Sequence, residues 1–155
     1  MTTVPRTARL VLVSSDGSPV GVLPPLAVTT PWWQDIAPVI HAVREHYGID
    51  VVVLRLLSGE LAQPPGGCVT YLAEVDTPVA LGVLSAATAD ALDEHPLRHA
   101  YARPGGPAAD LGWARSVLAR HGLRTTAAAE QIRTWNLSSV WRLPVGDRYV
   151  WLKVV

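Results

Sequence analysis

The sequence contains one lysine, one cysteine and no phenylalanine among its 155 residues. The lone Cys68 excludes an internal disulfide and argues against a cysteine-based zinc site. Acidic and basic residues balance to a formal net charge of +0, so nothing in the overall charge points to binding of nucleic acids or anionic membranes. No apolar run approaches the ~20 residues of a membrane span, and the N-terminus lacks the apolar core of a signal peptide. We therefore expect a cytoplasmic protein with no nucleic-acid or membrane partner.

The scarcity of lysine makes its one position informative. Arginine supplies all of the other Lys+Arg residues, whereas Lys153 lies in a mostly apolar run near the C-terminus. An ammonium kept at such a position indicates a site for a compact point charge, and a common site of that kind is a phosphate contact on a strand. The alternative is a lysine on an edge strand that blocks pairing with another sheet.

Hydrophobic periodicity predicts an α+β arrangement in residues 1–101, with a small mixed sheet and one or two packed helices. Expected strands cover residues 9–14, 20–23, 51–57 and 68–75, and the first two form a hairpin. Thr30-Pro31 predicts the start of a helix that carries apolar residues at helical spacing and ends at Gly48, and Pro38 is expected to kink this helix or delay its start. A short helix is expected over residues 86–94.

The region after residue 101 is predicted to be a Pro/Gly linker, residues 102–109, followed by residues 110–155 with a helix and a β-hairpin. The helix is expected over residues 110–121, and a four-residue turn at 144–147 joins the last two strands. Three tryptophans in this segment need a surface to cover them, and a hairpin alone is marginally stable. The hairpin can dock on residues 1–101, be covered by a partner such as a second copy, or begin a longer protein, and we favour the last.

Two pairs of residues have alternative interpretations. Trp32 and Trp33 can form a stacking platform for a base or sugar, or can belong to the core or an interface, which is the commoner case. His95 and His99 have the i, i+4 spacing of two zinc ligands, but Pro96 lies between them, so a solvated helix end is favoured.

Residues 131–143 (QIRTWNLSSVWRL) and 147–155 (DRYVWLKVV) resemble the start of the kinase N-lobe in the aminoglycoside and choline phosphotransferase family. In that family a polar turn lies between two strands, and a later strand carries the lysine that contacts ATP phosphate. The resemblance implies that Ser138 and Ser139 lie in the loop over the phosphates and that Lys153 contacts them. It also implies ATP and Mg²⁺ as cofactors of the intact parent, with no cofactor for this chain alone.

The order of elements in residues 1–101 is similar to the Nudix fold, whose helix carries the pattern G-x5-E-x7-R-E-U-x-E-E-x-G-U. Aligned on Gly48-Ile49, this chain keeps the carboxylate Glu45, while Ala42 and His46 stand at glutamate positions. One carboxylate is too few for Mg²⁺, which needs near-octahedral oxygen coordination. The resemblance therefore implies a degenerate Nudix-like domain without hydrolase activity and without a metal site.

We expect a non-catalytic binding or regulatory N-terminal region of an ATP-dependent small-molecule phosphotransferase, inactive as this chain alone. Its partner would be a nucleotide or another small molecule. The alternatives are a divergent nucleoside-diphosphate hydrolase of the Nudix type and a self-associating domain that forms a homodimer through the Trp-rich C-terminal hairpin.

Overall fold

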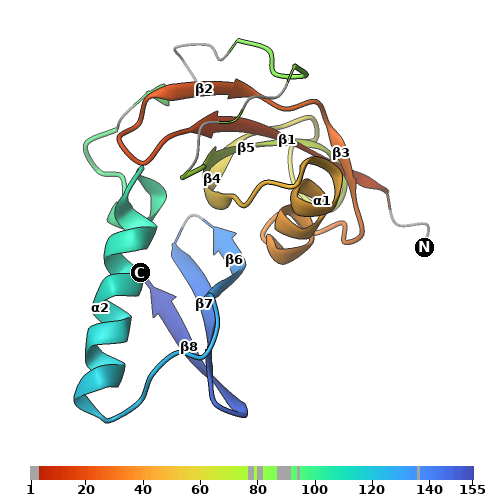
Figure 1. Ribbon diagram of the computed structural model, residues 1–155. Helices are drawn as coiled ribbons and strands as arrows, with labels where there is room; N and C mark the ends of the chain where they lie inside the picture. Colours follow the sequence, from red (N-terminus) through yellow and green to blue (C-terminus); the bar gives the residue numbers. More distant parts are fainter. Residues whose placement is uncertain (1–3, 77–78, 80–81, 87–91, 94, 136) are drawn as a thin grey trace.

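The computed structural model describes residues 4–76, 79, 82–86, 92–93, 95–135 and 137–155, and shows an α+β fold, as predicted (Figure 1). In these ranges two α-helices accompany a five-stranded and a three-stranded sheet. The short helix predicted over residues 86–94 lies largely outside the described residues. None of the helices in the described ranges is long and apolar enough to cross a membrane.

The first sheet is mixed, with strand order β2-β1-β5-β4 and with β3 also paired to β1. Its strands are β1 (Arg6–Val13), β2 (Pro19–Val22), β3 (Leu26–Val28), β4 (Val52–Gly59) and β5 (Gly67–Glu74). β1 and β5 are parallel, whereas the other pairs are antiparallel. The predicted hairpin is confirmed in β1 and β2. β3 was not predicted, because Pro24-Pro25 ends β2 and the three residues that follow carry no periodicity of their own.

Helix α1 (Ala37–Tyr47) covers one face of the first sheet and buries Val39, Ile40 and Val43 against it (Figure 1). The helix begins at Ala37 and not at Thr30-Pro31, and Pro38 lies in its first turn, where a missing N–H costs no helical hydrogen bond. The helix ends as predicted at Gly48, which has a left-handed φ of 68° and donates its N–H to the Arg44 carbonyl at 2.9 Å.

The second sheet is an antiparallel meander of β6 (Glu130–Trp135), β7 (Ser138–Val145) and β8 (Arg148–Val154). Helix α2 (Gly106–Arg120) packs on one of its faces, where Ala114 and Leu118 meet Trp141 and Leu143. This helix provides the cover that Trp141 requires. Val145 pairs with Arg148, so the turn between β7 and β8 has two residues rather than the predicted four.

Helix α2 begins at Gly106, four residues before the predicted start and inside the predicted linker. The preceding Gly105 has a φ of +79°, and its N–H donates to a carboxylate oxygen of Glu74 on β5 at 2.7 Å. Gly106 lies so close to the Ala100 carbonyl that a Cβ there would be 1.8 Å from the oxygen. The two glycines therefore allow close backbone packing at the helix start.

The second sheet docks on residues 1–101, which form the first part of the chain. This is the first of the three alternatives stated above for the C-terminal hairpin. The Gln131 side chain accepts a hydrogen bond from the Val53 N–H at 2.9 Å and donates one to the Val53 carbonyl at 2.7 Å. The Ile36 N–H donates to the Ile132 carbonyl at 3.0 Å. β6 therefore lies against both the edge strand β4 and the start of α1.

Candidate functional site

Lys153 lies on β8 directly opposite Val140 of β7, and its side chain is exposed. Among the described residues, no carboxylate lies within ion-pair distance of its ammonium group. A point charge without a protein counter-ion is available to an anionic ligand.

Lys153 borders a hollow of about 490 Å³ that is lined both by residues 1–101 and by the second sheet. Trp32 and Gln34 line it from the segment between β3 and α1, and Pro64 lines it from the loop between β4 and β5. The second sheet contributes the remaining lining residues, which are Arg133, Trp135, Ser138, Val140 and Lys153. The volume is within the range of small-molecule sites, ~300–1,000 Å³.

Strand register explains why these residues of the second sheet share a face. Trp135 is opposite Ser138, Arg133 is opposite Val140, and Val140 is in turn opposite Lys153. Directly opposed residues in antiparallel strands project to the same side of the sheet. The strands thus deliver two cations, a hydroxyl and an indole to one surface.

The structure brings Ser138 and Lys153 together but places Ser139 elsewhere. Ser139 is the next residue on β7, so its side chain projects to the opposite, buried face, where it is 1% exposed. Its hydroxyl accepts a hydrogen bond from Trp141 Nε1 at 3.0 Å. Ser139 is therefore not among the residues that line the hollow.

Arg133 is the second cation of the hollow, and sequence reasoning did not identify it. Its Nε lies 3.1 Å from a carboxylate oxygen of Asp35, and the backbones of the two residues form an isolated β-bridge. The Arg133 side chain remains 59% exposed, whereas that of Asp35 is 19% exposed. One carboxylate thus balances one of two cations, and the hollow keeps a net positive charge that favours anions.

The segment 30–35 owes its shape to Arg6, which is 1% exposed. Its guanidinium donates to the carbonyl of Trp32 at 2.5 Å and to the carbonyl of Asp35 at 2.9 Å. Further bonds go to Thr30 Oγ1 at 3.2 Å and to the Tyr71 hydroxyl at 3.0 Å. A buried charge requires such partners, and here they hold in place the segment that bears Trp32 and Gln34.

Tyr71 completes this buried network. Its hydroxyl donates to the Trp33 carbonyl at 2.7 Å. Burial raises the pKa of Tyr71 to about 12, although the nearby Arg6 charge opposes the shift. The phenol therefore stays protonated and keeps donating at neutral pH.

Trp32 and Trp33 have different roles. Trp33 is 4% exposed and belongs to the core, and its Nε1 donates to the Gly66 carbonyl at 2.8 Å. The Gly66 N–H donates to the Pro31 carbonyl at 2.8 Å. These hydrogen bonds hold the segment before α1 against the loop between β4 and β5. Trp32 is 47% exposed and borders the hollow. The stacking interpretation therefore applies to one tryptophan and the core interpretation to the other.

The remaining candidates lie apart from this hollow. His41, Glu45 and His46 are exposed on α1, and the His99 ring stacks on Tyr101 at 5.5 Å between centroids. In the part of the chain that the structure describes, no group of three or more His, Cys, Asp or Glu side chains is arranged to hold a metal ion.

No protein-family model, curated protein or solved structure matches this chain.

Proposed function

We propose that the chain is a non-catalytic nucleotide-binding and regulatory region of an ATP-dependent small-molecule phosphotransferase, with Lys153 contacting phosphate. One observation carries the proposal. The only lysine of the chain, the hydroxyl-bearing Ser138 and the half-exposed Trp32 border the same hollow, although Trp32 lies near the other end of the sequence.

The positive charge in the hollow suits the phosphates of a nucleotide, and the aromatic surface suits its base. Lys153 and Arg133 offer positive charge to phosphate, and Ser138 offers a hydroxyl donor. Trp32 and Trp135 offer indole faces to a base, and such stacking contributes about 1–3 kcal/mol per base. The proposal concerns binding and not the transfer of phosphate. Mg²⁺, which the family resemblance implies for the intact parent, would accompany the nucleotide phosphates.

A regulatory role follows from the shared construction of the hollow. The first part of the chain supplies Trp32 and Gln34, and the buried Arg6 fixes their segment. A change in that part of the chain would move one wall of a site whose charge lies on the second sheet. Nucleotide affinity would change as a result, because binding depends on both walls.

The test is titration of the protein with ATP, with and without Mg²⁺, followed by quenching of tryptophan fluorescence. Lys153→Met should weaken ATP binding about 10- to 100-fold, because a hydrogen bond to a charged group contributes about 1.5–3 kcal/mol. Arg148→Met is the matched control, since it removes one exposed cation from the same strand but not from the hollow. Equal ATP affinities of the Lys153 variant and the wild type would overturn the proposal, as would the absence of ATP binding by the wild type.

A second candidate function is self-association through β8. This strand is at the edge of the second sheet, and its Tyr149 and Trp151 are 52% and 59% exposed. An edge strand with exposed aromatic residues can pair with the same strand of a second copy. Light scattering should then show a dimer that Trp151→Ser converts to a monomer. A wild-type monomer at about 100 µM would remove this candidate.

A further inference from the structure

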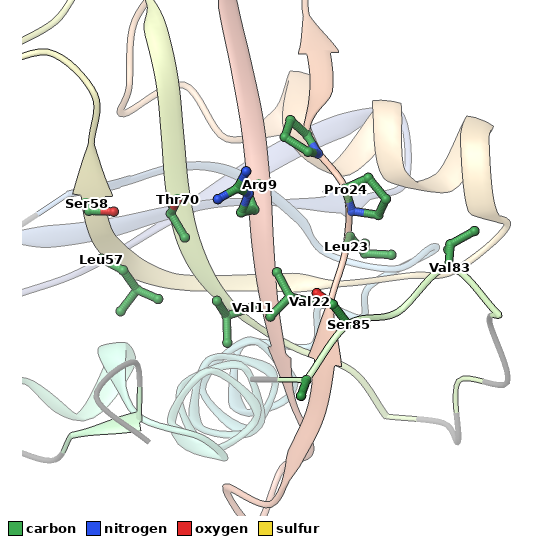
Figure 2. A pocket seen from close by; sticks show the side chains of 12 residues that line it. Arg9, Val11, Val22, Leu23, Pro24, Leu57, Ser58, Thr70, Val83 and Ser85 are labelled. Carbon is green, nitrogen blue, oxygen red and sulfur yellow. The ribbon is translucent and has the colours of Figure 1, made fainter. Parts of the chain in front are cut away.

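A second hollow, of about 780 Å³, lies on the face of the first sheet opposite α1 (Figure 2). It shares no lining residue with the hollow at Lys153. β1, β4 and β5 form its floor, and β2 and residues 83–86 form its wall. The N–H of Val22 donates to the Ser85 carbonyl at 2.8 Å, and the N–H of Ser85 donates back at 3.1 Å. This pair of hydrogen bonds fixes the wall to the edge of the sheet.

The floor of this hollow has a polar row. Arg9 of β1 is opposite Thr70 of β5, and Thr70 is opposite Ser58 of β4, so the three residues lie side by side across three strands. Figure 2 shows Arg9 and Thr70 next to each other on neighbouring strands. Arg9 is exposed, and no carboxylate of the described residues lies within ion-pair distance of it. The carboxylate on β5, Glu74, is four residues from Thr70 and accepts the Gly105 N–H.

The rest of the hollow is apolar. Val11 lies two residues beyond Arg9 on the same face of β1, and its strand partner is Val22. Leu57 adds to this surface, and Val83, which is 49% exposed, lies at the rim. A single cation with hydroxyl neighbours thus lies beside an apolar surface in the same hollow.

We propose that this hollow binds a small amphiphilic carboxylate, such as a medium-chain fatty acid. Its carboxylate would meet the Arg9 guanidinium, whose planar fork matches two carboxylate oxygens, and the hydroxyls of Thr70 and Ser58 would donate to the same group. The apolar chain would lie over Val11 and Val22. One unpaired cation matches a monoanion, whereas a phosphate dianion would need further positive charge.

The experiment is calorimetric titration of the full chain with decanoate. Arg9→Gln should weaken binding about 10- to 100-fold, because the charge-assisted hydrogen bonds are lost. Val83→Asp should also weaken decanoate binding, since it places a like charge at the rim of the hollow. Both substituted side chains are exposed, so thermal unfolding followed by circular dichroism should show that the variants fold.

Two controls separate this site from the nucleotide site. Arg44→Gln removes an exposed cation on α1 and should leave decanoate binding unchanged. Arg9→Gln should leave ATP binding unchanged, because Arg9 does not line the hollow at Lys153. Decan-1-ol, which has the chain but no charge, should bind at least 10-fold more weakly than decanoate. No decanoate binding, equal binding by the Arg9 variant, or equal binding of the alcohol would overturn the proposal.

Discussion

Replacing Gln131 by leucine should loosen the attachment between the two sheets. Gln131 is 4% exposed, and its amide pairs with both main-chain groups of Val53, which is 0% exposed. Val53 lies on β4, the edge strand of the first sheet, so the amide satisfies groups that a neighbouring strand would otherwise satisfy. The leucine side chain has a similar size but can neither donate nor accept a hydrogen bond.

The magnitude follows from the two bonds. The substitution leaves the Val53 N–H and carbonyl buried without these partners, and each such group costs about 1–3 kcal/mol. The apolar side chain offsets part of this loss through its own burial, so we expect a net loss of about 3 kcal/mol in the free energy of unfolding. Domains have total stabilities of about 5–15 kcal/mol, and the variant should therefore remain folded but clearly weakened.

Urea unfolding followed by tryptophan fluorescence measures this effect. With a denaturant slope of about 2 kcal/mol/M, the midpoint should fall by about 1.5 M. Gln63→Leu is the matched control, because Gln63 is exposed in a loop, and the change in its unfolding free energy should stay within about 0.5 kcal/mol. An unchanged midpoint for Gln131→Leu would refute the reasoning, since the paired groups of Val53 would then contribute nothing to stability.

Two further predictions concern buried charges. Arg6→Met should lower the free energy of unfolding by about 3 kcal/mol, because the carbonyls of Trp32 and Asp35 lose their donor, and should also weaken ATP binding. Urea unfolding and ATP titration measure the two effects, and an unchanged ATP affinity in a folded variant would contradict the link between Arg6 and the hollow. Burial raises the pKa of Glu74, so its ionisation opposes folding, and the stability of the wild type relative to Glu74→Gln should fall as pH rises above the ordinary pKa of a glutamate. A pH-independent difference in urea midpoint between these two proteins would contradict that assignment.

Local signals predicted most of the fold. Glycine after a periodic apolar run placed the end of α1 correctly, because Gly48 needs no partner beyond its own helix. The start of α2 was predicted four residues too far along the chain, because this helix start depends on contacts outside its own helix. Gly105 and Gly106 suggest a flexible linker in the sequence, whereas the hydrogen bond from the Gly105 N–H to Glu74, which is 31 residues away, gives this turn a packed position. Such long-range contacts leave no local pattern.

The candidate site was only partly predictable. Lys153 was identified because it is the only lysine of the sequence, and Ser138 from a resemblance; strand alternation would have shown that Ser139 faces the other way from Ser138. Arg133 could have been found by the same alternation, since it shares a face with Trp135. Arg6 and Asp35 could not have been found in this way, because their roles depend on pairing between segments far apart in sequence.

Arg6 holds the segment 30–35 mainly through main-chain oxygens and not through the side chains at 32 and 34. The path of that segment is thus independent of which residues occupy these two positions. Substitutions at 32 and 34 can therefore alter the lining of the hollow while the backbone stays in place. This separation makes the segment a natural starting point for directed evolution of specificity.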